Sequence, residues 1–208
     1  EIITFHGIEY TIQDPSSFDA SSTDVAILAA GSTAAKTYAH QYVNAGNYVI
    51  DLSSEYRYED DVPLVIPEIN GAELAELNEP SLISNPNCST SQLLMVLDSI
   101  HQAFNIDILN IATYQAVSGT GKKAVQELQT QSNQTDSEIN PEIYPKPIAF
   151  NVIPQCDVFL ENDFTKEEMK LVWETNKILD PSISVQATCA RVPVFNGHSE
   201  AVFFRVEQ

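Results

Sequence analysis

Ile83-Ser84-Asn85-Pro86-Asn87-Cys88-Ser89-Thr90-Ser91 is the stretch that decides the fold of this chain, because it predicts an extended run, a sharp turn and then a helix. Pro86 disfavours helical backbone at Asn85, and the hydroxyls of residues 89–91 supply capping groups for a helix start. An apolar face follows at intervals of four, three and four residues, formed by Leu93, Leu97, Ile100 and Phe104. That spacing predicts an amphipathic helix.

Cys88 falls at the mouth of this predicted helix. The positive end of a helix dipole lowers the pKa of a nearby thiol and so favours the thiolate, which is the nucleophilic form. Cys88 is therefore a candidate nucleophile. Its position alone leaves the ordinary alternative open, since most cysteines are small, buried and inert.

The composition indicates a globular chain, with 208 residues of which 43% are hydrophobic. A formal net charge of −19 argues against a nucleic-acid partner, because phosphate backbones demand a basic face. No apolar run reaches the roughly 18 residues of a membrane span, so we expect a cytoplasmic protein. Cys88, Cys156 and Cys189 lack the C-x-x-C spacing of zinc sites, which predicts reduced thiols and no metal.

The first part of the chain predicts a β-α-β unit. Residues 2–11 suit a strand or hairpin, and the continuous apolar run 24–30 is typical of a strand buried on both faces of a parallel sheet. An Ala-rich helix ending near Gly46 and a strand over residues 48–52 follow. The turn at Gly31 could hold a ligand phosphate at the helix start, although any tight turn between a strand and a helix would look similar.

The second part alternates strands and helices. Strands are expected over residues 106–114, 184–192 and 201–206, and their alternation suggests an antiparallel sheet with one face available to a second subunit. Helices are expected over residues 122–131 and 164–178, the latter with a capping box formed by Thr165 and Glu168. Residues 132–147 are polar and carry prolines, which predicts a long excursion.

Three further strings follow the Cys88 stretch, namely YQAVSGTG at 114–121, NVIPQ at 151–155 and RVPVFNGHSE at 191–200. In this order they closely resemble the aspartate-semialdehyde dehydrogenase family. The resemblance implies an α/β fold: a partial doubly wound, Rossmann-like parallel sheet that is the remainder of an NADP-binding domain (1–88), then an α+β catalytic and dimerisation domain (89–208).

The family's glycine-rich loop lies upstream of the first residue, and its chain continues past residue 208. We therefore expect an internal piece of a longer protein, inactive by itself. An apolar face along Val25, Ile27 and Leu28 should then be exposed, because a neighbouring strand of the sheet would be missing.

The implied reaction is the reductive dephosphorylation of L-aspartyl 4-phosphate to L-aspartate 4-semialdehyde through a cysteine thioester. NADPH is the expected reductant, although the residues that would distinguish NADP from NAD lie outside this sequence. The family serves the pathway to lysine through diaminopimelate, and to methionine, threonine and isoleucine. The expected partners are the semialdehyde or acyl phosphate, inorganic phosphate and a second subunit, in a homodimer or tetramer.

The resemblance also assigns roles to individual residues. Cys88 matches the nucleophile, His198 the acid/base and Gln115 the group that orients the thioester. Glu167 matches the residue that binds the substrate's amino group, and Arg191 the residue that binds its carboxylate. Arg57 and Lys170 match phosphate ligands, and Ser118 and Gly119 match positions that touch the cofactor, which we expect to occur through backbone amides at a turn.

Other interpretations of the same residues exist. Arg57 also suits a surface arginine paired with Glu59 or Asp60, and His198 a polar residue at a strand edge. The chain could be a non-catalytic relative that serves as a structural or binding subunit. N-acetyl-γ-glutamyl-phosphate reductase also uses a cysteine and a histidine, but its substrate has an acylated amine that gives Glu167 no purpose. A thiol protease is a poor alternative, because no local pattern couples an orienting Asn or Asp to the cysteine.

Overall fold

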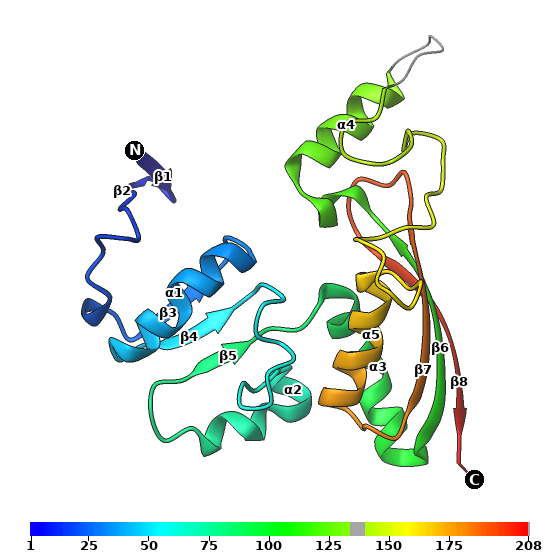
Figure 1. Ribbon diagram of the computed structural model, residues 1–208, viewed down its shortest axis with the longest axis horizontal. Coiled ribbons are helices and arrows are strands. Elements are labelled where there is room, and N and C mark those ends of the chain that lie inside the picture. Colours follow the sequence, from blue (N-terminus) through cyan, green and yellow to red (C-terminus); the bar gives the residue numbers. More distant parts are fainter. Residues whose placement is uncertain (134–139, 208) are drawn as a thin grey trace. The chain divides into compact units, whose positions relative to one another are not determined.

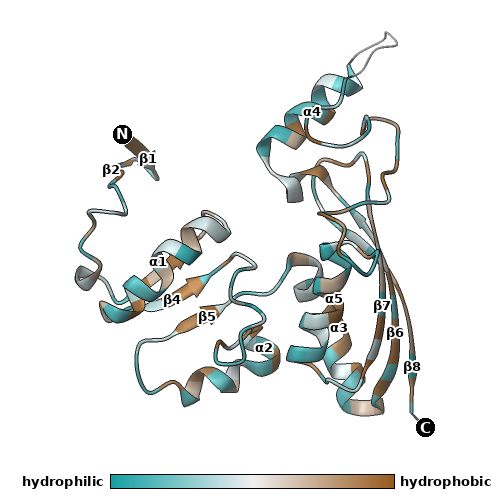
Figure 2. Ribbon diagram, viewed as in Figure 1, coloured by the Kyte–Doolittle hydropathy of each residue, from teal (hydrophilic) through white to brown (hydrophobic). Residues whose placement is uncertain are grey.

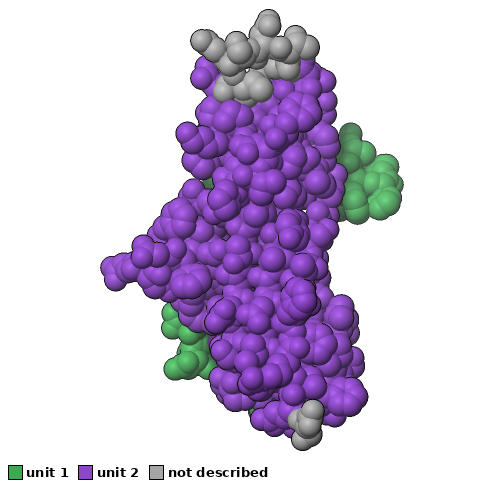
Figure 3. Space-filling view, turned by 90° about the vertical axis from the view of Figure 1, so that its right-hand side faces the viewer, with its two compact units in different colours: residues 1–63, 73–85 green, residues 64–72, 86–208 purple. Residues whose placement is uncertain are grey.

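The computed structural model describes residues 1–133 and 140–207, which form two compact units. Unit 1 comprises residues 1–63 and 73–85, and unit 2 comprises residues 64–72 and 86–208 (Figure 3). The short helices α2 (Pro67–Asn70) and η2 (Gly71–Glu76) lie where the chain passes between the two units. Among the described helices, none combines the length and the apolar character that a bilayer span requires.

Unit 1 begins with an antiparallel hairpin of β1 (Ile2–Phe5) and β2 (Ile8–Thr11). His6 and Gly7 form its turn, with φ of 49° and 78°, and positive φ at both central residues is the geometry of a type I′ hairpin. Of the strand or hairpin expected over residues 2–11, the structure shows the hairpin. A short 3-10 helix, η1 (Ala20–Ser22), follows.

A three-stranded parallel sheet forms the rest of unit 1, in the order β3 (Val25–Leu28), β4 (Tyr48–Asp51), β5 (Leu82–Ser84) (Figure 1). Helix α1 (Ser32–Asn44) connects β3 to β4, which confirms the β-α-β unit. A small core lies between helix and sheet, and Figure 2 shows the strands of this sheet as its apolar part.

Strand β3 is buried on one face only, in contrast to the burial on both faces that a run of this kind suggests. Ala26 and Leu28 pack against the core of unit 1. Val25 and Ile27 point the other way and are 51% and 63% exposed. The expected exposure of the apolar face is confirmed for these two residues, while Leu28 is partly buried.

Unit 2 contains a mixed sheet in the order β7 (Ser184–Arg191), β6 (Ile106–Gln115), β8 (Ser199–Val206). Strand β6 pairs antiparallel with β8 but parallel with β7, so the antiparallel expectation holds only for β8. Helix α5 (Lys166–Ile178) directly precedes β7 and packs on it, which suits the crossover that a parallel pair requires.

The core of unit 2 lies between this sheet and the helices α3 (Cys88–Phe104) and α5 (Figure 1). Leu94, Leu109 and Leu171 are its fully buried centre. Helix α4 (Lys122–Ser132), entered through η3 (Val117–Thr120), belongs to a second cluster. The expected excursion 132–147 falls partly outside the described residues, and its part 140–147 contains no helix or strand.

Helix α3 has the expected start at Cys88 but a different cap. The Asn87 side chain accepts hydrogen bonds from the Ser89 and Thr90 amides at 2.8 and 3.4 Å. Since Cys88 is the first helical residue, Ser89 and Thr90 already lie inside the first turn and supply donors rather than caps. Leu93 and Leu97 are buried as expected, whereas Phe104, the last residue of the helix, is 60% exposed.

The capping box at the start of α5 is confirmed: the Thr165 hydroxyl accepts from the Glu168 amide, and the Glu168 carboxylate accepts from the Thr165 amide at 2.7 Å. Thr165→Ala should therefore lower the free energy of unfolding by about 1 kcal/mol. Urea unfolding followed by circular dichroism measures this loss. Thr130→Ala, at an exposed position of α4, serves as the control and should change stability by less than about 0.5 kcal/mol. An equal loss in both variants would contradict the capping role.

Candidate active site

The turn that carries Cys88 is held by two carboxylates of α5. The Asn87 side-chain amide donates to Glu167 Oε1 at 3.0 Å, and the Asn87 backbone N–H donates to Glu174 Oε2 at 2.7 Å. The Cys88 side chain is exposed at the first turn of α3. A reagent can therefore reach the sulfur while its backbone is fixed.

The pKa of the Cys88 thiol is raised, contrary to the lowering that its place at a helix start suggests. Desolvation of the sulfur by the surrounding protein is the largest cause, and the negative charge of Glu167 raises the pKa further. Hydrogen bonds from the Ser89 amide and hydroxyl lower the pKa but do not outweigh these two effects. The first amides of the helix are already capped, because Asn87 Oδ1 accepts hydrogen bonds from the Ser89 and Thr90 N–H groups. The protein surroundings of Cys88 thus favour the thiol over the thiolate.

Glu167 is the centre of a polar network in unit 2. Gln115 Nε2 donates to Glu167 Oε1 at 3.1 Å and to Ser89 Oγ at 3.3 Å. Lys170 Nζ contacts Glu167 Oε2 at 2.9 Å and Asp157 Oδ2 at 2.8 Å. Burial works to raise the pKa of Glu167, but the Lys170 charge and the hydrogen bonds outweigh it, so the pKa lies below its ordinary value. The carboxylate is therefore charged at neutral pH.

His198 and Arg191 meet at Ala116. The Ala116 N–H donates to His198 Nδ1 at 3.0 Å, and Arg191 Nη1 donates to the Ala116 carbonyl at 2.7 Å. Burial, followed by the Arg191 charge, lowers the pKa of His198, which favours the neutral imidazole. Because Nδ1 accepts a hydrogen bond, we assign the hydrogen of the neutral ring to Nε2.

Gly119 lies directly beside this pair. A Cβ at Gly119 would lie 2.9 Å from His198 Nε2 and 3.2 Å from Arg191 Nη1, so a side chain there would displace both groups. The amides of Ser118 and Gly119 donate to the carbonyls of Phe195 and Ala116. This contradicts the expectation that these amides are available to a cofactor, and leaves the Ser118 hydroxyl and the bare Gly119 backbone.

Arg191 is 7% exposed, and its buried Nε has no hydrogen-bond partner. Across residues 1–133 and 140–207, no carboxylate lies within ion-pair distance of its guanidinium. A buried charge of this kind is costly without a counterion. Arg191 is thus suited to an anionic ligand.

Unit 2 therefore brings together Cys88, Gln115, Glu167, Lys170, Arg191, His198, Ser118 and Gly119. Arg57 lies in unit 1, where it is 6% exposed and its Nη2 donates to the Leu52 carbonyl at 3.3 Å. Among the described residues, no cluster of three or more His, Cys, Asp or Glu side chains could hold a metal ion.

The sequence analysis missed Asn87, Asp157 and Glu174. An asparagine directly before a predicted helix is a capping signal, so Asn87 could have been found. Glu174 follows Glu167 by two helical turns and shares its face. Asp157 carries no local signal, because it reaches Lys170 only through the folded chain.

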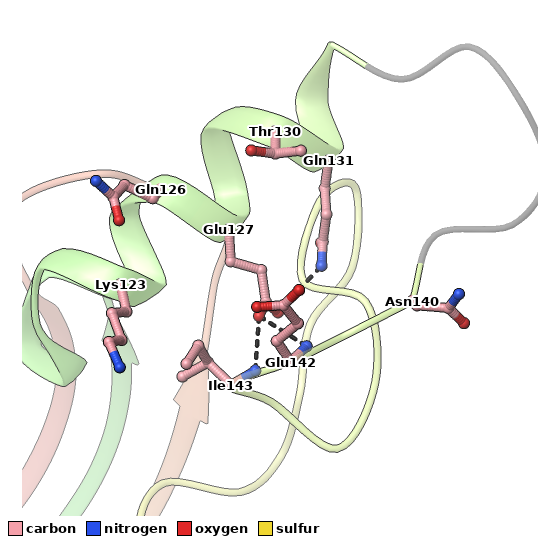
Figure 4. Close-up of a pocket in the computed structure, with 8 residues that line it drawn as sticks. All are labelled: Lys123, Gln126, Glu127, Thr130, Gln131, Asn140, Glu142 and Ile143. Carbon is pink, nitrogen blue, oxygen red and sulfur yellow. Dashed lines mark hydrogen bonds between the residues drawn. The ribbon is translucent and has the colours of Figure 1, made fainter.

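A pocket of about 690 Å³ lies apart from these residues, between α4 and residues 140–143 (Figure 4). Its buried Glu127 accepts hydrogen bonds from the amides of Glu142 and Ile143 at 2.9 and 2.6 Å. The Glu127 carboxylate thus fixes Glu142 and Ile143 against α4.

Comparison with known proteins gives consistent matches. Residues 3–77 match the family described as semialdehyde dehydrogenase, NAD binding domain, and residues 97–208 match semialdehyde dehydrogenase, dimerisation domain. Aspartate-semialdehyde dehydrogenases from Shewanella sp. (strain DB6705) and Bacillus subtilis are 46% and 42% identical over 99% of the chain. The chain spans 62% of the length of each of these two curated relatives.

Solved structures of aspartate semialdehyde dehydrogenases also match this chain. The crystal structure of aspartate semialdehyde dehydrogenase II from Vibrio cholerae, also solved as a complex with ASA, gives a TM-score of 0.95 at 44% identity, covering 99% of this chain and 62% of that one. The enzyme from Candida albicans with NADP gives 0.65 at 27% identity, covering 89% of this chain and 51% of that one.

Alkylation with iodoacetamide should modify Cys88 first. Cys88 is exposed, whereas Cys156 and Cys189 are 1% and 0% exposed. Burial raises the pKa of Cys156 to about 11 and that of Cys189 to about 12, which suppresses their thiolates at neutral pH. Peptide mapping by mass spectrometry identifies the site. Earlier labelling of Cys156 or Cys189 in the folded chain would refute the assignment of Cys88 as the accessible thiol.

Lys170→Met should lower the free energy of unfolding at about pH 7 by about 3 kcal/mol, because it leaves Glu167 and the partly exposed Asp157 without their shared cation. Both carboxylates have a pKa below the ordinary values of 4.5 and 3.8, since Lys170 outweighs their burial. Their stabilisation is present above these values and is lost as the pH falls through the lowered ones.

The difference between wild type and Lys170→Met should thus be greatest near neutrality and shrink below about pH 4. Urea unfolding across this pH range measures it, with Lys122→Met at an exposed position of α4 as the control. A pH-independent difference would show that lost packing, rather than the ion pairs, causes the effect.

Proposed function

Because this chain belongs to the semialdehyde dehydrogenase family, we propose that it carries the acyl-transfer site of an NADP-dependent aspartate-semialdehyde dehydrogenase. The observation that carries the proposal is the charge pattern of unit 2. Cys88 is accessible, Glu167 is charged and acts on its thiol, and the buried Arg191 of the same unit has no carboxylate partner among the described residues. These charges complement the ammonium and carboxylate of an amino-acid substrate.

In the biosynthetic direction, the Cys88 thiolate attacks the acyl carbon of aspartyl 4-phosphate. The C–S bond forms, the bond from carbon to the phosphate oxygen breaks, and phosphate leaves with the electron pair. The product is a thioester on Cys88. Gln115, which contacts Ser89 and Glu167, would orient it.

His198 would act on the oxygen of the reacting carbonyl. With its hydrogen on Nε2, the neutral imidazole can donate a hydrogen bond to the negative charge that develops there. For Nε2 to take the thiol proton, the ring must carry its other hydrogen on Nδ1, which breaks the contact with Ala116. We therefore assign oxyanion stabilisation to His198 in this geometry, and acid/base transfer when the Ala116 contact opens.

The cofactor would lie beside η3. NADPH, when bound, supplies a hydride to the acyl carbon, and release of the semialdehyde then frees the thiol. The Ser118 hydroxyl would hold it, and Gly119 would let it approach, since its missing side chain leaves room beside His198 and Arg191. Residues 1–88 would belong to the NADP-binding domain and residues 89–208 to the catalytic and dimerisation domain.

Arg57 and Lys170 remain the proposed phosphate ligands. Lys170 already contacts two carboxylates, Asp157 and Glu167, which leaves one of its three N–H donors for phosphate.

The second subunit of a homodimer would cover the open face of the unit 2 sheet. This face lies opposite α3 and α5 and includes Tyr114 and Phe203, which are 46% and 76% exposed. Apolar residues exposed together on a sheet face suit a protein interface. We place the protein in the cytoplasm and in the biosynthesis of lysine, methionine, threonine and isoleucine, as in the family it belongs to.

Arg191 and Arg57 should have separate kinetic signatures in the complete gene product. Arg191→Leu should raise the KM for the semialdehyde, because a lost bidentate ion pair costs about 2 to 5 kcal/mol, and Arg57→Leu should raise the KM for phosphate. Arg191→Lys retains charge without the forked geometry and should give a smaller effect. Steady-state formation of NADPH measures both constants. Equal effects of both leucine variants on both substrates would refute this division of roles.

A further inference from the structure

Glu174 is a buried carboxylate to which the proposed mechanism gives no role. It lies on α5 two turns beyond Glu167 and is 0% exposed. Its Oε2 accepts the Asn87 backbone N–H at 2.7 Å. Asn87 is itself 7% exposed, so this amide needs an acceptor from the protein. A buried amide that is left without an acceptor destabilises the fold.

The Asn87 amide lies at a decisive point of the chain. Pro86 before it has no N–H, and Cys88 after it is the first residue of α3. Asn87 has extended backbone, with φ −59° and ψ 147°, and its side chain bonds Ser89, Thr90 and Glu167. The bond to Glu174 therefore fixes the peptide from which both the cap and the Cys88 side chain are oriented.

We propose that Glu174 is a positioning residue for Cys88, and that its carboxylate holds the Asn87–Cys88 turn in the orientation required for thiol attack. It acts through Asn87, because its Oε2 accepts the backbone N–H of that residue. The importance of this orientation for catalysis rests on the proposed function. The effect on the thiol itself does not, and can be measured without substrate.

Glu168 provides a matched control on the same helix. Its Oε1 accepts the backbone N–H of Cys189 at 3.0 Å, and its Oε2 accepts the Thr165 amide. Glu168 thus also provides an acceptor for a backbone N–H of strand β7 and caps α5, but neither of these hydrogen bonds involves the Cys88 turn. A variant of Glu168 reports what the loss of a structural glutamate does by itself.

The test compares Glu174→Met, Glu174→Gln and Glu168→Met by the rate at which iodoacetamide labels Cys88 as a function of pH. Glu174→Met should speed labelling at neutral pH by roughly threefold or more, because a loosened turn brings more water around the accessible Cys88 sulfur and so weakens the desolvation that raises the pKa of its thiol. Glu174→Gln keeps an oxygen acceptor and should label at nearly the wild-type rate. Glu168→Met should also do so, although its melting temperature falls.

Cys156 and Cys189 serve as internal references in every variant and should stay protected. An unchanged pH profile of Cys88 in Glu174→Met would overturn the proposal. So would an equal change in Glu168→Met, because destabilisation of α5 would then explain both results. In the complete gene product, Glu174→Met should also lower kcat by about 100-fold with little change in KM. If the wild type has no dehydrogenase activity, the proposed function fails while the labelling result stands.

Discussion

The contact between α5 and the turn before α3 is the constraint on which the rest of the site depends. Glu167 and Glu174 bind the side chain and the backbone of the same residue, Asn87. Through Asn87 they set the first turn of α3 and therefore the place of Cys88. Glu167 also accepts from Gln115 of β6, so one carboxylate couples a helix start, a second helix and a strand end.

The site holds a carboxylate, Glu167, and a guanidinium, Arg191, in separate hydrogen-bond networks, in a chain whose formal net charge is −19. Lys170 balances Glu167 and Asp157, and the resulting network is mostly closed to solvent. Arg191 and His198 lie around Ala116, where burial and the guanidinium keep the imidazole neutral. The zwitterionic substrate that we propose would thus find an anionic group and a cationic group that are both fixed before it binds, which would lower the ordering cost of binding.

The adjacent ends of β6 and β7 supply residues to both hydrogen-bond networks of the site, the one around Glu167 and the one around Ala116. The parallel pair β6 and β7 ends at Gln115 and Arg191, which are partners in the register, and β8 begins directly after His198. Val117 and Ser118 then donate to the carbonyls of Val194 and Phe195. These bonds hold η3 against the segment between Arg191 and His198, and so fix Gly119 beside both side chains.

The sequence by itself determined the secondary structure and the chemical types at the site. Proline, capping residues and periodicity are local signals, and they placed α3, the capping box of α5 and the β-α-β unit correctly. Local signals of this kind do not specify how distant segments pair. Periodicity does not tell parallel from antiparallel pairing, and β7 proved parallel to β6 because α5 provides a crossover.

Only the tertiary structure decided the electrostatics. The helix start alone suggested a lowered pKa for Cys88, but burial and Glu167, which is distant in sequence, raise it. Lys170 likewise proved to be shared with Asp157, and Asn87 to be held by Glu174. A pKa or an ion pair depends on the distances between groups and on their burial, and a linear pattern of residues specifies neither.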